Sequence, residues 1–102
     1  MKYENILLSA DGEISVWRVP KEVSDNLEEY CLEYLKWEME SEDPRAKRIR
    51  SGEPHFVEES FVEYLNKHVF PNNKSYFVED TGIAIYEGKE IDKYKGCSEF
   101  NF

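Results

Sequence analysis

Cysteines and long apolar runs are scarce in this sequence of 102 residues. Its two cysteines, Cys31 and Cys97, are too few and too far apart for the disulfide framework of a small secreted domain. Near the N-terminus the apolar run at residues 6–8 is far shorter than a signal-peptide core or a membrane span. These shortages predict a soluble, cytoplasmic protein with reduced thiols and no membrane partner.

Motifs that would define a reaction are also missing. The sequence has no Gly-rich phosphate loop, no serine elbow and no GK[ST] motif. The chain has four cysteine and histidine side chains that could bind a metal: Cys31, His55, His68 and Cys97. They lie far apart in the sequence, so a zinc site would form only if the tertiary fold brought them together. Cys31 has the position of a small buried hydrophobe, and His68 that of a hydrogen-bonded residue at a helix rim. We therefore expect no metal, no cofactor and no catalytic residue; a small enzyme using Cys97 is the third interpretation.

Positive charge is in the minority, since 22 acidic residues face 13 basic ones for a formal net charge of −9. Residues 1–43 hold twelve acids and four bases, and residues 52–102 hold ten acids and five bases. Between them lies a basic island with no acid, formed by Arg45, Lys47, Arg48 and Arg50. Because a net field of this sign repels polyanions, we expect a cationic partner rather than nucleic acid.

Two strands are expected at the start of the chain. Apolar residues at 6–8 and 14–17 flank Asp11-Gly12, and Asp-Gly between such runs is a strong hairpin signal. Pro20 cannot donate to a sheet ladder, so it should end the second strand.

Helical patterns follow this hairpin. Asp25 with Glu28 has the spacing of a capping box, which predicts a helix over residues 25–41. Its apolar arc is wide enough to need cover from two directions. Asp43-Pro44 should close this helix and leave residues 44–54 as a loop with at most one helical turn. A second helix is expected over residues 58–69, with a narrower apolar face.

A second hairpin is predicted where residues 76–78 and 83–86 flank Asp80-Thr81-Gly82. The elements together predict a single α+β domain over residues 1–102, with two β-hairpins forming a mostly antiparallel sheet in the order β-β-α-α-β-β and a helix pair on one face. Both faces of this sheet are apolar, so the second face should meet either the C-terminal tail, residues 88–102, or another chain.

Glu38 projects into the apolar arc of the first helix, where an unpaired carboxylate would be costly. Either this end of the helix extends beyond the core into solvent, or Glu38 and Glu42 form ion pairs with Arg45, Arg48 or Arg50 of the basic island. Contact with a partner protein or with nucleic acid are the less favoured roles of the island.

The polar arc of the first helix forms an acidic stripe of Asp25, Glu29, Glu33 and Glu40. Such a stripe either serves solubility or docks a basic protein and makes their encounter salt-sensitive. Exposed aromatic residues would then act as anchors; the candidates are Trp17, Phe77 and Tyr86. We expect a small acidic binding protein, immunity-like or inhibitor-like, that recognises a basic protein. In size and charge it is similar to bacterial immunity proteins, although no motif carries that likeness. The alternative is a homodimeric accessory protein that pairs through an apolar sheet face.

Overall fold

The computed structural model describes all residues except 11, 85–86 and 88–90. In chain order the elements are β1 (Tyr3–Ser9), β2 (Glu13–Pro20), α1 (Lys21–Asp25), α2 (Leu27–Glu40), α3 (Pro44–Arg50), α4 (Val57–Tyr64), the π-helical turn η1 (Leu65–Val69), β3 (Tyr76–Ala84), the 3-10 turn η3 (Asp92–Tyr94) and β4 (Ser98–Asn101). All four α-helices lie between β2 and β3 in the chain. The α+β class, with strands, then helices, then strands, is confirmed.

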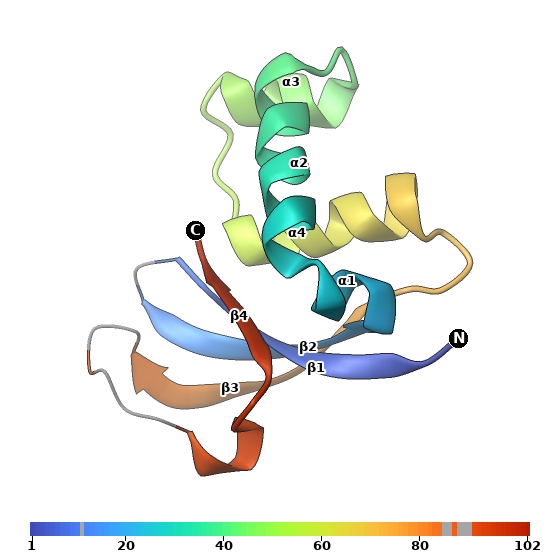
Figure 1. Ribbon diagram of the computed structural model, residues 1–102. Coiled ribbons are helices and arrows are strands. Elements are labelled where there is room, and N and C mark those ends of the chain that lie inside the picture. The colour runs from blue at the N-terminus through green and yellow to red at the C-terminus, as the bar shows by residue number, and fades with distance from the viewer. Residues whose placement is uncertain (11, 85–86, 88–90) are drawn as a thin grey trace.

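One mixed sheet with the strand order β3-β2-β1-β4 forms the base of the molecule, and the helices lie on one side of it (Figure 1). β1 and β2 pair antiparallel from Tyr3 opposite Pro20 to Leu8 opposite Ser15, as the first hairpin signal predicts. Asp11 of that signal lies outside the described residues. β3 pairs antiparallel with β2, whereas β4 pairs parallel with β1.

The second hairpin does not form at Asp80-Thr81-Gly82, because these residues belong to the single strand β3. β2 continues beside β3, with Ser15 opposite Asp80 and Glu13 opposite Ala84, so the intervening residues bulge out of the ladder. Gly82 has a φ of 77°, which suits a bulge as well as a turn. The Thr81 hydroxyl donates to the carbonyl oxygen of Ile14 at 2.9 Å and holds the bulge against β2.

The first predicted helix is divided into α1 and α2 at Asn26. The capping box at Asp25 is wrong, since Asp25 lies in the last turn of α1 and its carboxylate accepts a hydrogen bond from Lys21 Nζ. α2 ends at Glu40, before Asp43-Pro44 as predicted. Those two residues then begin α3, which is longer than the single turn expected: the Asp43 carboxylate accepts from the backbone N–H of Arg45 at 2.9 Å. The second predicted helix is confirmed as α4 and η1.

The main core lies between the helices and the face of the sheet that carries Ile6, Leu8, Trp17 and Val19. Tyr34 of α2 is its largest fully buried side chain, and its ring contacts the rings of Trp37, Phe61, Tyr64 and Phe102. The cover of α2 is incomplete, however, because Leu32 and Met39 are exposed. None of the helices in the described residues has the length and apolarity that a membrane crossing needs.

The opposite face of the sheet is covered by the chain's own tail. Leu7, Ile14 and Val16 form a second buried cluster with Tyr94 of η3, and Ile91 and Cys97 pack at its edge. Over these residues the choice between the tail and another chain is therefore decided in favour of the tail. The cover does not extend to Tyr76 and Val78 of β3, which are exposed.

A candidate partner-binding groove

Large apolar side chains are exposed on β3 and on the segment just before α4. Phe56 is 73% exposed and Phe77 is 48% exposed, and Tyr76 and Val78 beside Phe77 are exposed as well. Scattered apolar residues are normal on a protein surface, but adjacent ones mark sites of interaction.

Phe56 and Phe77 border a groove of about 510 Å³ between the start of α4 and the sheet. Its floor is Trp17, which is only 7% exposed and meets Phe77 edge-on with ring centroids 5.3 Å apart. The indole N–H donates to Ser15 Oγ at 2.9 Å, and the Ser15 hydroxyl donates to the carbonyl oxygen of Leu8 at 3.1 Å. The floor therefore has its polar atoms paired internally, and its ring offers apolar surface.

Carboxylates form the rim of this groove. Glu58 and Glu59 come from the first turn of α4, where the positive end of the helix dipole favours them, and Asp80 comes from β3. The described residues that line the groove include no lysine or arginine. A neighbouring hollow of about 670 Å³ shares Trp17 and Glu59 but also contains Lys67 and Lys74. We name the first hollow, lined by Ser15, Trp17, Phe56, Glu58, Glu59, Phe77 and Asp80, the acid-aromatic groove.

Of the three predicted anchors, the structure places only Phe77 at an exposed position. Trp17 is a correction: it lies in the core, because Ile6 opposite it on β1 and the helices above cover its face of β2. Tyr86 lies outside the described residues. Sequence reasoning missed Phe56, which sits at the N-cap position of α4, and it gave Glu58 and Glu59 no binding role.

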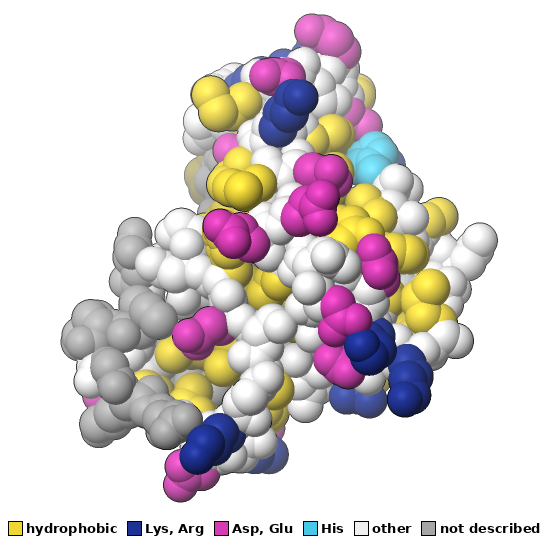
Figure 2. Space-filling view, viewed as in Figure 1, with side chains coloured by type: hydrophobic (Ala, Val, Ile, Leu, Met, Phe, Trp, Pro, Cys, Tyr) yellow, Lys and Arg dark blue, Asp and Glu magenta, His cyan; other side chains and the backbone are white. Residues whose placement is uncertain are grey.

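The residues of the acidic stripe are separated by the break at Asn26. Asp25 lies on α1 and is engaged by Lys21. Glu29, Glu33 and Glu40 are exposed on α2, where Figure 2 shows acidic side chains interspersed with apolar ones. Glu33 and Glu40 also line a shallow depression of about 400 Å³ together with Trp37 and Tyr64. Burial, with Glu33 adding to it, raises the pKa of Tyr64. This stripe lines a different hollow from Phe77.

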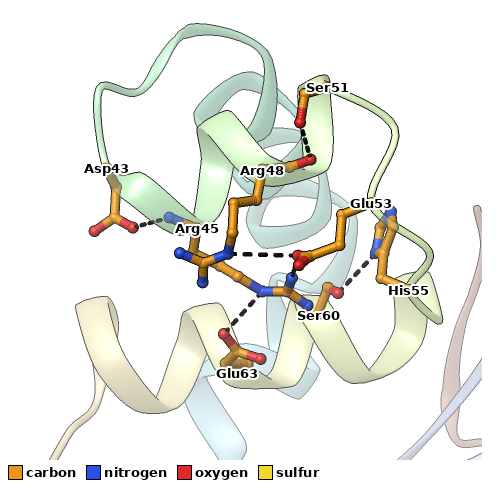
Figure 3. Close-up of polar contacts among 8 residues, drawn as sticks. All are labelled: Asp43, Arg45, Arg48, Ser51, Glu53, His55, Ser60 and Glu63. Carbon is orange, nitrogen blue, oxygen red and sulfur yellow. Dashed lines mark hydrogen bonds and ion pairs between the residues drawn. The ribbon is translucent and has the colours of Figure 1, made fainter.

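The basic island is neutralised by neighbouring acids, as Figure 3 shows for Arg45 and Arg48. Arg45 Nη1 lies 2.5 Å from Glu53 Oε2, and its Nε lies 3.3 Å from Glu63 Oε1 on α4. Glu42 does form an ion pair, but with Lys47 at 2.9 Å. The acids that hold Arg45 and Arg48 are thus Glu53 and Glu63 instead of Glu38 and Glu42. Arg50 donates to the backbone oxygen of Glu38 at 2.9 Å.

Of the two alternatives for Glu38, the ion pair with the basic island is not found among the described residues. Glu38 Oε2 is buried without a hydrogen-bond partner among the described residues, and the same holds for the hydroxyl of Tyr34. Burial raises the pKa of Tyr34, and the nearby carboxylate of Glu38 raises it further. Neither Tyr34 nor Glu38 lines the acid-aromatic groove.

The two thiols and two imidazoles have different surroundings. Cys31 is buried, which raises the pKa of its thiol to about 12. Burial, with Glu4 adding to it, also raises the pKa of Cys97. His55 Nδ1 lies 2.7 Å from Ser60 Oγ, while His68 Nε2 lies 3.6 Å from Asp43 Oδ2 and its ring packs on Trp37. Within the described part of the chain, no three His, Cys, Asp or Glu side chains converge as a metal site would require.

No family model, no curated protein and no solved structure matches the chain. A function is therefore inferred from the groove residues.

Proposed function

We propose that this chain is a small non-catalytic binding protein that recognises a basic protein partner through the acid-aromatic groove. One observation carries the proposal: Phe56 and Phe77 are exposed at a groove whose charged lining residues, Glu58, Glu59 and Asp80, are all acidic. The whole chain has a formal charge of −9, so long-range and local fields favour the same kind of partner. Inhibition of a basic enzyme, as by an immunity protein, is one form of this role.

The apolar and charged parts of the groove have different effects on binding. Burying one large apolar side chain contributes roughly 1.5–3 kcal/mol, so Phe56 and Phe77 are the anchors. A lysine or arginine of the partner placed over these rings gains a cation–π interaction of about 0.5–2 kcal/mol. The rim carboxylates mainly raise the association rate and select the partner. Binding of this kind weakens as salt screens the rim.

Two further features are consistent with the proposal. Glu29, Glu33 and Glu40 extend the negative field over α2, and they lie beside exposed Leu32 and Met39, so this face is the alternative contact surface. Both cysteines are unpaired, and we propose the cytoplasm as the compartment because free thiols persist there.

Self-association is the second candidate, because the apolar residues Tyr76, Phe77 and Val78 are exposed along the outer strand β3. A second copy would, however, bring another net charge of −9 to the same surface. Electrostatic complementarity therefore favours a basic partner over a second copy.

Two variants with equal charge change test the proposal. The groove variant carries Glu58→Lys, Glu59→Lys and Asp80→Lys, and the stripe variant carries Glu29→Lys, Glu33→Lys and Glu40→Lys. Each immobilised protein is used to capture proteins from the source organism at low salt, and the captured partner is then purified and titrated against all three.

We expect a basic protein that binds the wild type and the stripe variant and binds the groove variant at least tenfold more weakly. Equal binding to the groove variant and the wild type would refute the groove as the contact surface. Preferential loss with the stripe variant would move the site to α2, and capture of no basic protein would refute the function itself.

A further inference from the structure

β3 is the outer strand of the sheet next to the acid-aromatic groove. In the order β3-β2-β1-β4 it pairs on one side with β2, and no described strand pairs with its other side. It spans nine residues, from Tyr76 to Ala84, whereas the other outer strand, β4, spans four. A long outer strand with exposed apolar residues is a template for the addition of another strand.

The two halves of β3 differ in how their backbone groups are used. In the second half, side chains already accept from the backbone N–H groups: Glu13 Oε1 from Gly82 at 2.7 Å, Thr81 Oγ1 from Ile83 at 3.1 Å, and Glu87 Oε2 from Ala84 at 2.7 Å. These contacts and the bulge interrupt the regular backbone pattern there, which disfavours strand addition. Tyr76, Phe77 and Glu79 pair with β2 on one side of the strand. Among the described residues, no side chain accepts from the N–H groups of residues 76–79, so those N–H groups that face away from β2 are available. Pairing is therefore open only along the first half.

The open half adjoins the groove. Phe77 belongs both to this half and to the groove lining. Asp80, which also lines the groove, is the residue directly after this half. Because side chains of a strand alternate between faces, every second residue of an added strand would lie on the helix side, next to Phe77 and the rim formed by Glu58 and Glu59.

We infer that the basic partner contributes an extended segment that adds as a strand to residues 76–79, with its lysine or arginine side chains in the acid-aromatic groove. The inference rests on the proposed function and specifies its binding mode. The occupant is chosen by charge, because the groove lining carries three carboxylates and no described base. In such complexes main-chain hydrogen bonds contribute affinity and the pockets for alternate side chains contribute specificity.

A peptide with removable backbone donors tests this mode. The probe is acetyl-Arg-Val-Arg-Tyr-Arg-Val-amide, compared with two isomers that are N-methylated at residues 1, 3 and 5 or at residues 2, 4 and 6. In a β-ladder only alternate N–H groups face the neighbouring strand, so the two isomers differ in what they remove. Binding is followed by chemical-shift titration, and hydrogen exchange is measured at the backbone amides of residues 76–79.

We expect the parent peptide to slow exchange in residues 76–79, one isomer to bind at least tenfold more weakly, and the other to bind within about threefold of the parent. Val78→Lys should weaken binding of the parent peptide, since an edge lysine repels a basic strand. The control Leu32→Lys makes the same charge change on α2 and should leave binding unchanged.

Several outcomes would overturn the inference. Two isomers that bind alike would show that only side chains enter the groove, and an absence of parent binding at millimolar concentration would exclude strand addition. Concentration-dependent protection of residues 76–79 without peptide would assign the edge to a second copy. The proposed function fails separately, if the captured partner binds the groove variant as tightly as the wild type.

Discussion

Removing the hydroxyl of Tyr34 should leave the protein as stable as before or more stable. Tyr34 is fully buried, and its hydroxyl has no hydrogen-bond partner among the described residues. A buried polar group without a partner costs about 1–3 kcal/mol, part of which Tyr34→Phe recovers. The ring contacts with Trp37, Phe61, Tyr64 and Phe102 are kept. We expect the free energy of unfolding to rise by up to about 1 kcal/mol.

Two other substitutions calibrate this value. Tyr34→Leu removes the ring from the centre of the core and should cost about 3 kcal/mol, as large-to-small core changes do. Tyr30→Phe removes a hydroxyl that donates to Glu22 Oε1 at 3.3 Å on the surface, so a small loss of about 0.5 kcal/mol is expected.

Urea unfolding followed by circular dichroism measures all three free energies, because a single domain of this size is expected to unfold in one transition. The decisive comparison is between the two Tyr→Phe variants. If Tyr34→Phe loses more than about 1 kcal/mol, the hydroxyl must be hydrogen-bonded in the folded protein, to Glu38 or Ser60, and the reasoning from its orphaned state is refuted.

Three further predictions follow from the groove, the thiol and the basic island. Phe56→Ala should change the free energy of unfolding by less than about 0.5 kcal/mol in urea unfolding but weaken binding of the captured partner at least tenfold in a titration. Met39→Ala, at a residue of similar exposure (74% against 73%), should change neither quantity. Burial raises the pKa of Cys31 from a reference value of 9.0 to about 12, so the unfolded chain loses this proton first and stability should fall as the pH rises from 9.0 towards 12. This fall should be smaller in Cys31→Ala, and an equal fall in both proteins would contradict the assignment. Arg45→Met breaks two ion pairs of a mostly buried guanidinium and should lower the free energy of unfolding in urea by about 1–2 kcal/mol. The control Lys47→Met breaks an exposed ion pair and should lower it by less than about 0.5 kcal/mol. Equal losses would argue against Arg45 as the residue that holds α3 to α4.

Several elements follow from signals that are local in the chain. The strands around Asp11-Gly12 pair as expected, Pro20 ends β2, and α4 with η1 occupies the predicted second helix. The position of Cys31 within the apolar arc also predicted its burial correctly. Such features depend on turn chemistry, helix capping and periodicity, which neighbouring residues determine among themselves.

Asp80-Thr81-Gly82 shows where local signals are insufficient. The same residues suit a hairpin turn and a bulge, and the choice depends on whether β2 continues beside them. In the fold β2 does continue, and the last strand comes from the tail, which reaches β1 in parallel. The basic island is a similar case. The sequence predicted that acidic residues would pair with its arginines, but which acids do so, Glu53 and Glu63, depends on how α3 packs.

The sequence by itself determined the acidic net charge, the aromatic core and the order of strands and helices, because composition and short-range pattern suffice for these. Only the tertiary structure decided that Trp17 is a buried floor, that the tail covers the second sheet face, and that Phe56 and Phe77 border one groove with Glu58, Glu59 and Asp80. These residues are brought together by the packing of α4 on the sheet, a long-range contact that no local periodicity encodes.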